Sequence, residues 1–328
     1  ILDEPTAVLT PQETEELFHE LMEFKKKGHT IIFISHKLKE IKQICDRITI
    51  MKNGRSMGTY SMGDMDERSI SRLMVGRDVI KTVEKKKANP TETILEVKNL
   101  SCINEDGKHA VNNINLKVRR GEILGIAGVE GNGQSEFVEC ISGMRKDYKG
   151  HVSILGQCVD KLNIKKIRKA GLSHISEDRM SYGVATEASI SDNLISDKLG
   201  ESMVGCGPIL SSKKISKLSS ELVENFLIKC SSYKQPVSML SGGNMQKVVV
   251  AREFAREPAV MIANQPSRGV DVGATEFIHK KLVEIRDKGS AVLLVSADLN
   301  EVMELSDSLA VFYGGEVVAY FEDSKSVT

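Results

Sequence analysis

The residues best suited to chemistry lie in a glycine-rich stretch, Gly128-Val-Glu-Gly-Asn-Gly-Gln-Ser135, between an expected strand and an expected helix. The spacing is that of a phosphate-binding loop, GxxxxGK[ST], except that Gln134 replaces the lysine. Backbone N–H groups of such a loop cradle phosphate oxygens, and Ser135 can ligate Mg²⁺. An amide cannot supply the charge that reaches the β- and γ-phosphates. The alternative is a glycine turn without a ligand. The candidate residues are Gly128, Gly131, Gly133, Gln134 and Ser135.

The elements that position this loop are expected to alternate between strand and helix. Glu122 to Ala127 is a short apolar strand, and a helical stretch from Ser135 to Ser142 ends at Gly143. Ala259 to Ala263 and Ala291 to Val295 are apolar runs typical of buried strands, each followed by helical periodicity. The alternation predicts an α/β sheet with helices on its faces. Residues 180–235 interrupt it and are predicted to form an inserted, mostly helical subdomain.

An internal repeat divides the chain. Residues 1–55 align with residues 262–316 at a constant offset of 261, without a gap and with about thirteen identities. The second copy begins near Thr93, after a lysine-rich linker. We therefore expect a fragment with about 170 residues missing before Ile1. Its expected parts are the end of a first domain (1–80), a linker (81–92) and a complete second domain (93–328) with a helical subdomain at about 180–257.

Composition excludes several classes of protein. Lysine and arginine number 45 and so do aspartate and glutamate, and this zero net charge argues against nucleic acid as the main partner. The longest apolar runs are far shorter than the ~18 residues that span a bilayer. Six scattered cysteines without a CxxC pair argue against a disulfide scaffold or a zinc site and fit a reducing cytosol.

The segment Leu240-Ser-Gly-Gly-Asn-Met-Gln246 resembles the signature motif LSGGxxQ of ABC transporter ATPase subunits. The resemblance implies a P-loop NTPase fold of the ABC type, with a mixed sheet, flanking helices and an inserted helical subdomain. It also implies that helix-end groups of the motif hold the γ-phosphate of an ATP bound by the opposite domain. The alternative is an ordinary serine N-cap with a flexible turn. The candidate ATP-binding residues are Ser241, Gly242, Gly243 and Gln246.

The start of the chain is similar to the end of the family's Walker B strand. The resemblance implies that Asp3 reaches Mg²⁺ through water and that Glu4 is the general base for the attacking water. A strand from Ile31 to Ile34 leads to His36, which resembles the switch histidine that contacts the γ-phosphate. The alternative is that these acids are solvated rim residues and that the histidine is structural.

At the matched positions of the second copy the charged groups are missing. Asn264, Gln265 and Ala297 stand where the first copy has Asp3, Glu4 and His36. In the ABC family, each ATP lies between the Walker motifs of one domain and the signature of the other. The intact Walker B of copy one therefore belongs with the intact signature of copy two. The uncharged replacements all belong to the other composite site, the one formed by the Walker motifs of copy two, and we expect that site to be degenerate.

Ser176-Glu177-Asp178-Arg179 follows an expected strand, Leu172 to Ile175, and resembles the family's loop that couples the nucleotide state to the membrane partner. Glu177 lies near the position of the usual glutamine of that loop. The alternative is a charged surface turn. Within the family, Ile126 to Glu136 and Ala263 to His279 resemble the fused ATPases of simple-sugar and nucleoside importers.

This resemblance implies a peripheral ATPase on the cytoplasmic face of the membrane, with ATP and Mg²⁺ as cofactors. Its implied partners are two membrane permeases and, indirectly, an extracellular solute-binding protein, and its two ABC domains form a pseudo-dimer. By itself the chain is expected to hydrolyse little or no ATP. The alternative is a tandem ABC ATPase that acts on ribosomes or DNA without a permease; such proteins usually keep both sites catalytic.

Overall fold

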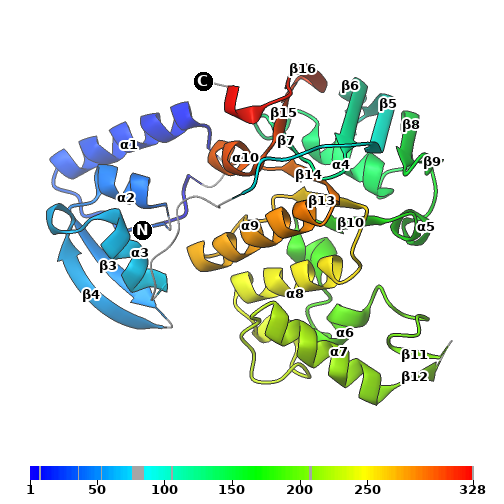
Figure 1. The fold of residues 1–328 in the computed structure, drawn as a ribbon. Helices are drawn as coiled ribbons and strands as arrows, with labels where there is room; N and C mark the ends of the chain where they lie inside the picture. The colour runs from blue at the N-terminus through cyan, green and yellow to red at the C-terminus, as the bar shows by residue number, and fades with distance from the viewer. Residues whose placement is uncertain are drawn as a thin grey trace. The chain divides into compact units, whose positions relative to one another are not determined.

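The computed structural model describes residues 1–6, 9–35, 37–52, 54–75, 85–104, 106–206 and 209–326 (Figure 1). The chain forms two compact units. Unit 1 comprises residues 1–82 with 271–276, and unit 2 comprises residues 83–270 with 277–328. The predicted linker begins at 81, and its residues 81–84 lie outside the described part of the chain.

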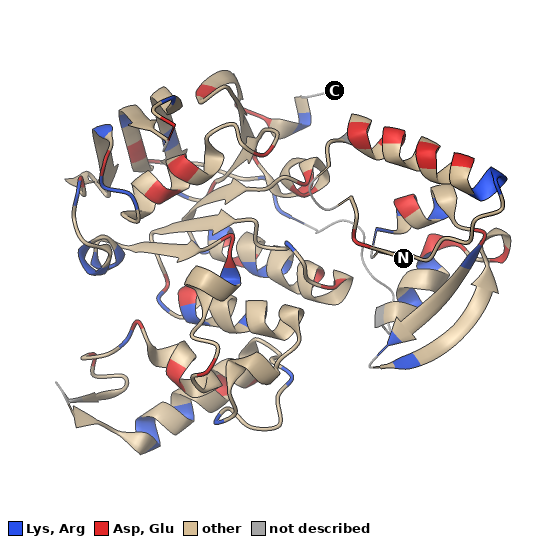
Figure 2. Cartoon of the chain, turned by 180° about the vertical axis from the view of Figure 1, so that it is seen from behind, with Lys and Arg blue, Asp and Glu red and all other residues tan. Residues whose placement is uncertain are grey.

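Unit 1 contains two small sheets. β1 (Leu2–Asp3) pairs in parallel with β2 (Phe33–Ile34), and β3 (Arg47–Lys52) pairs antiparallel with β4 (Arg55–Ser61). One hydrophobic cluster of unit 1 contains four buried isoleucines, 41, 48, 50 and 70. Acidic residues recur along the first helix of this unit (Figure 2). The helices are α1 (Pro11–Lys26), α2 (Leu38–Ile44), η1 (Met62–Asp64) and α3 (Glu67–Val75).

The central sheet of unit 2 has six strands in the order β10-β13-β14-β7-β15-β16. All neighbours are parallel except the last pair, so the sheet is mixed, as predicted. Three inner strands are buried along their whole length, which requires cover on both faces. The strands are β7 (Ile123–Ala127), β10 (Leu172–Ile175), β13 (Val260–Asn264), β14 (Ala291–Val295), β15 (Ser308–Tyr313) and β16 (Glu316–Phe321).

A second, antiparallel sheet of unit 2 shares a hydrophobic core with the central sheet. Within this core the rings of Phe137 and Phe312 meet edge to face at 5.4 Å. The strands of the second sheet, in spatial order, are β6 (His109–Arg119), β5 (Thr93–Ile103), β8 (Lys149–Ile154) and β9 (Gln157–Cys158).

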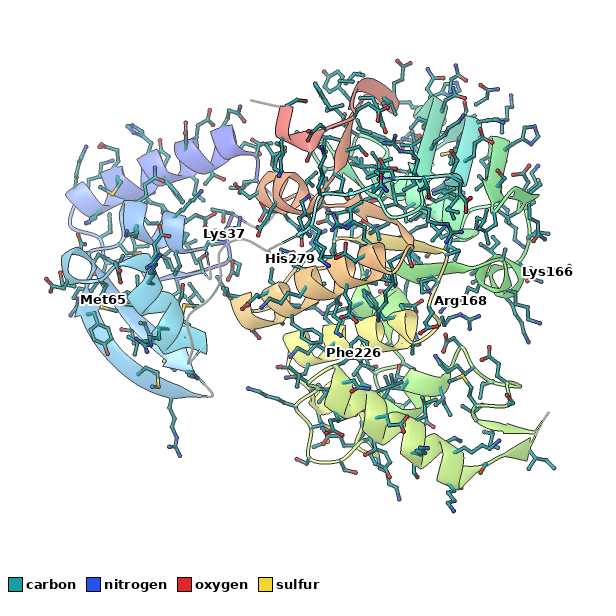
Figure 3. The ribbon with its side chains drawn as sticks, viewed as in Figure 1. Lys37, Met65, Lys166, Arg168, Phe226 and His279 are labelled. Carbon is teal, nitrogen blue, oxygen red and sulfur yellow. The ribbon has the colours of Figure 1, made fainter. Side chains whose placement is uncertain are left out.

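Helices cover the central sheet, and the region after β10 is partly helical, as expected. Phe226 contacts the rings of Phe254 and Phe277, which attaches this region to α8 and α9 (Figures 1 and 3). The region also contains a small hairpin of β11 (Gly205–Cys206) and β12 (Ile209–Leu210). The helices of unit 2 are α4 (Gln134–Ser142), α5 (Ile164–Lys169), η2 (Arg179–Gly183), α6 (Ile190–Ile195), α7 (Ser212–Asn225), η3 (Val237–Met239), α8 (Gly242–Phe254), α9 (Val272–Asp287, whose first turn is grouped with unit 1), α10 (Leu299–Leu305) and η4 (Ser324–Ser326).

The sequence repeat is also a structural repeat. The bounds of α1, α2 and β3 become those of α9, α10 and β15 when 261 is added to each residue number. One ion pair recurs at the same offset: Lys25 pairs with Asp46 at 2.6 Å, and Arg286 pairs with Asp307 at 2.9 Å. The two copies thus form corresponding helices, a corresponding strand and a corresponding ion pair at equivalent positions.

The described end of the predicted linker packs onto unit 2. Lys85 donates from Nζ to the carbonyl oxygens of Leu305 and Ser306 at 2.9 and 2.6 Å and pairs with Asp307 at 3.3 Å. These carbonyls lie at the end of α10, where a cation is favoured. The segment from residue 85 onward is therefore more closely attached than its lysine-rich composition predicts.

The titration of the His174 imidazole on β10 is expected to make the free energy of unfolding depend on pH. Burial lowers the pKa of this ring to about 4, against the influence of Glu253, and Nε2 has no hydrogen-bond partner among the described residues. In the unfolded chain this imidazole is exposed and binds a proton near pH 6.5, whereas in the folded chain it stays neutral down to about pH 4. The free energy of unfolding therefore falls as pH drops from about 6.5 to about 4. We expect a loss of about 2 kcal/mol at pH 5 relative to pH 7.

Chemical denaturation at both pH values checks this expectation. His174→Gln removes the titrating ring and should flatten the dependence, whereas the control His151→Gln changes an exposed ring and should keep it. An unchanged pH dependence in His174→Gln would contradict the assignment.

Candidate functional site

The glycine-rich loop lies between β7 and α4, as predicted. Gly133 is the N-cap of α4 with φ of 93°, and a Cβ there would lie 2.1 Å from the carbonyl oxygen of Ala110. Gly131 has φ of 89°, in the same left-handed region. These positions require glycine because side chains rarely adopt that conformation and none fits at Gly133. The loop therefore has the local form of an anion-binding turn at a helix N-terminus.

Gln134 is turned back onto the loop that precedes it. Its Nε2 donates to the carbonyl oxygen of Val129 at 3.1 Å, and Asn132 donates to the same oxygen at 2.8 Å. The residue is 8% exposed, and a Cβ on Gly128 would lie 2.5 Å from its Nε2. A neutral amide thus closes the loop from within, and it contributes no positive charge.

Ser135, the expected Mg²⁺ ligand, is linked to the turn after β10. Its Oγ donates to Glu177 Oε2 at 3.0 Å, and the other carboxylate oxygen of Glu177 pairs with Arg268. The same Arg268 nitrogen also pairs with Glu130 of the loop at 3.1 Å. Arg268 was not singled out from the sequence, although it lies in the turn that directly follows the expected strand end at Ala263.

Ser241 is the N-cap of α8, a position that both interpretations of the signature-like motif predict. Its Oγ accepts from the backbone N–H of Asn244 at 3.4 Å and from Asn244 Nδ2 at 2.9 Å. Gln246 is buried and donates to the carbonyl oxygen of Pro266 at 3.0 Å. Capping does not exclude phosphate binding, because the first N–H groups of a helix have no intrahelical acceptor and the hydroxyl proton remains available.

Two of the expected degenerate positions contact each other. Gln265 Oε1 accepts from the backbone N–H of Ala297 at 3.1 Å, which ties the end of β13 to the end of β14. Asn264, at the end of β13, is buried with 5% exposure. All three side chains are uncharged, so this part of the site holds neither a carboxylate for a metal nor a base.

In unit 1, the loops after β1 and β2 are joined by Glu40. Its carboxylate accepts from Thr6 Oγ1 at 2.7 Å and from Ser35 Oγ at 3.4 Å. Asp3 is exposed at the end of β1, and Glu4 directly follows it. The structure therefore brings the expected acids beside the loop that leads to His36, but His36 itself lies outside the described residues.

The oxygen-rich surroundings of Ser135 fit a magnesium nucleotide. Mg²⁺ prefers hard oxygen ligands, and the Ser135 hydroxyl together with the Glu177 carboxylate supplies two such groups 3.0 Å apart. The cradle of backbone N–H groups suits phosphate oxygens. Bound Mg²⁺ would neutralise phosphate charge, while the missing lysine charge is not replaced within the loop itself.

Comparisons with known proteins agree with this geometry. Residues 111–268 match the model of the family described as ABC transporter. The chain is 40% identical over 320 residues to the glucose import ATP-binding protein TsgD13 of Haloferax volcanii, covering 97% of this chain and 58% of that protein. It is 39% identical over 317 residues to the nucleoside import ATP-binding protein NupA of Lactococcus lactis, with 97% and 63% covered.

A solved structure shows the same fold. The dimeric bacterial ABC transporter cassette MJ0796 has a TM-score of 0.61 at 21% identity, covering 69% of this chain and 97% of that chain. The chain spans 58% and 63% of the length of the two sequence relatives. None of the helices in the described ranges is long and apolar enough to cross a bilayer. The chain therefore has the fold of an ABC-transporter ATP-binding cassette and is related in sequence to the ATP-binding subunits of sugar and nucleoside importers.

Proposed function

We propose that this chain is part of an ATPase subunit that powers an ABC importer of simple sugars or nucleosides. The subunit has two ABC domains and two unequal ATP sites. The competent site combines Asp3, Glu4 and His36 of the first domain with Ser241 to Gln246 of the second. The degenerate site contains Gln134, Asn264, Gln265 and Ala297.

The observation that carries this proposal is the equivalence of Glu4 and Gln265. Both residues have left-handed backbone, with φ of 45° and 49°. Both donate their backbone N–H to the neighbouring strand, Glu4 to Ile34 at 2.9 Å and Gln265 to Val295 at 2.8 Å. Non-glycine residues rarely adopt this conformation, so its presence at both positions supports the equivalence of the two residues. The backbone is kept in both copies, and only the copy-one residue can accept a proton.

The mechanism follows from the residues of each site. Glu4 accepts a proton from the attacking water, because a carboxylate is a base at neutral pH and the amide of Gln265 is not. Ser241 and the first turn of α8 hold the γ-phosphate oxygens at a helix N-terminus. ATP and Mg²⁺ supply the reactive phosphoryl group and its charge neutralisation. The degenerate site binds nucleotide through its loop without activating water.

Two membrane permeases are the proposed partners, with the subunit peripheral on the cytoplasmic face and a solute-binding protein outside the cell. The names of the relatives support transport over action on ribosomes or DNA. We expect the tagged whole protein, purified from solubilised membranes, to retain permease subunits detectable by mass spectrometry. Enrichment of ribosomal proteins or DNA instead of permeases would contradict the importer assignment.

A further inference from the structure

The turns that follow β10 and β13 hold each other through two arginines. Arg268, in the second turn, pairs with the Glu177 carboxylate in the first. In the opposite direction, Arg179 donates from Nη1 to the carbonyl oxygen of Arg268 at 2.6 Å and from Nη2 to that of Gly269 at 3.2 Å. Each turn therefore binds the other through one guanidinium. We call Arg179 and Arg268 the arginine brace.

One end of the arginine brace reaches the phosphate loop at two points. Arg268 Nη1 pairs with Glu130 at 3.1 Å, and Glu177 accepts from Ser135 at 3.0 Å. The side chains of Arg268 and Glu130 are 38% and 41% exposed, so water screens their ion pair. Exposed ion pairs of this kind contribute little to stability. The contacts at this end are therefore suited to being replaced by a ligand.

The other end of the arginine brace supports the start of α8. A Cβ on Gly242 would lie 3.0 Å from Arg179 Nη2, so the guanidinium packs directly against this glycine. Gln246, one turn further along α8, donates to the carbonyl oxygen of Pro266 in the same turn that Arg179 binds. The signature-like motif thus rests on the turn whose position the two arginines fix.

We propose that the arginine brace couples the ligand state of the phosphate loop to the signature-like motif of the same unit. The proposal rests on the proposed function in taking the ligand to be ATP. Phosphate groups entering the loop repel the Glu130 and Glu177 carboxylates and attract Arg268, because like charges at short range disfavour each other. Arg268 then changes partners. Since Arg179 binds the Arg268 carbonyl and packs on Gly242, that change reaches the start of α8.

The consequence is a regulatory role for the degenerate site. In the proposed function the motif at Ser241 to Gln246 serves the competent site, whereas the loop at Gly128 to Ser135 belongs to the degenerate one. ATP at a site that does not hydrolyse it would adjust the groups that close the site that does. Arg268 and Arg179 are positioning residues in this scheme, since their role is exerted through Gly242 and its neighbours.

Hydrogen exchange at the start of α8 tests the coupling. The N–H groups of Asn244 and Met245 bond to Ser241 Oγ and Ser241 O at 3.4 and 2.9 Å, so their exchange reports opening of this turn. In this chain, which carries one such loop, we expect saturating ATP with Mg²⁺ to change their exchange rates about threefold or more. A fluorescent ATP analogue measures occupancy in parallel.

Substitutions of the two arginines have different expected effects, because Arg268 and Arg179 use their guanidinium nitrogens differently. One Arg268 nitrogen makes both ion pairs, so Arg268→Lys should keep the ATP-dependent change and Arg268→Gln should lose it. Arg179 uses two nitrogens on two carbonyls, so Arg179→Lys should lose the change and also raise exchange without nucleotide. Arg120→Gln removes an arginine that pairs with Glu92 and should behave as the unmodified chain.

The outcomes decide between the two proposals. An ATP-dependent change that persists in Arg268→Gln, with the analogue bound, overturns the coupling. If the unmodified chain binds no analogue, nucleotide binding by this loop fails as part of the proposed function. The samples without nucleotide then still test whether the arginine brace supports the start of α8. Faster exchange of the Asn244 and Met245 N–H groups in Arg179→Lys supports this role, and unchanged exchange overturns it.

Discussion

Glu4→Gln is expected to lower ATP hydrolysis by the whole subunit more than tenfold, which corresponds to at least ~1.4 kcal/mol in the activation barrier. The substitution keeps the shape of the side chain and removes the only proton acceptor at this backbone position in either copy. Its left-handed backbone is compatible with glutamine, because Gln265 adopts φ of 49° at the equivalent place. Loss of folding is therefore not the expected cause. Steady-state phosphate release measures the rate.

Gln265→Glu is the matched control for this prediction. It creates the missing carboxylate in the degenerate site, and its backbone N–H would still bond to Val295. It should restore little activity to the Glu4→Gln protein, because Gln134, Asn264 and Ala297 still lack the charged groups of a complete site. If Glu4→Gln keeps more than a tenth of the original rate, the degenerate site is active and the proposed asymmetry is wrong.

Periodic apolar segments made much of the fold predictable. Ala291 to Val295 and Leu172 to Ile175 form strands with the predicted bounds. The first is buried at all five positions and the second at three of its four, as expected of inner strands of a covered sheet. The strand expected at Ala259 to Ala263 is shifted by one residue. The ungapped repeat in the sequence also appears as equivalent elements in the structure, since each copy has apolar residues at the same spacings.

Contacts between distant turns were not predictable from the sequence. Glu177 was considered because of its place in a motif, but its partner Arg268 lies 91 residues away. Nothing in local spacing indicates that the turns after β10 and β13 meet, since that depends on their strands being neighbours in the sheet. The same holds for Gln134, whose amide donates to the carbonyl oxygen of Val129 in the preceding loop.

Gly242→Asp is expected to abolish most ATP hydrolysis by the whole subunit while leaving ATP binding to the first domain's own Walker motifs nearly unchanged. Gly242 does not have a positive φ, and an acid in the first helical turn favours helix formation, so α8 should persist. The added Cβ would lie 3.0 Å from Arg179 Nη2 and 3.3 Å from the Gly269 carbonyl oxygen. The new carboxylate would therefore draw Arg179 away from the turn that it supports.

The same carboxylate would also stand where the γ-phosphate of the competent site is proposed to sit. Two negative charges about 4 Å apart near a protein surface repel by about 4 kcal/mol, enough to prevent closure around ATP. Gly242→Asn separates this charge effect from bulk, because it has the same shape and no charge, and it should lose less activity. ATP affinity and turnover measured on both variants test the assignment. Equal losses in the two variants would mean that the steric contact with Arg179 dominates, and normal turnover in Gly242→Asp would mean that the LSGGNMQ segment serves only as a helix cap.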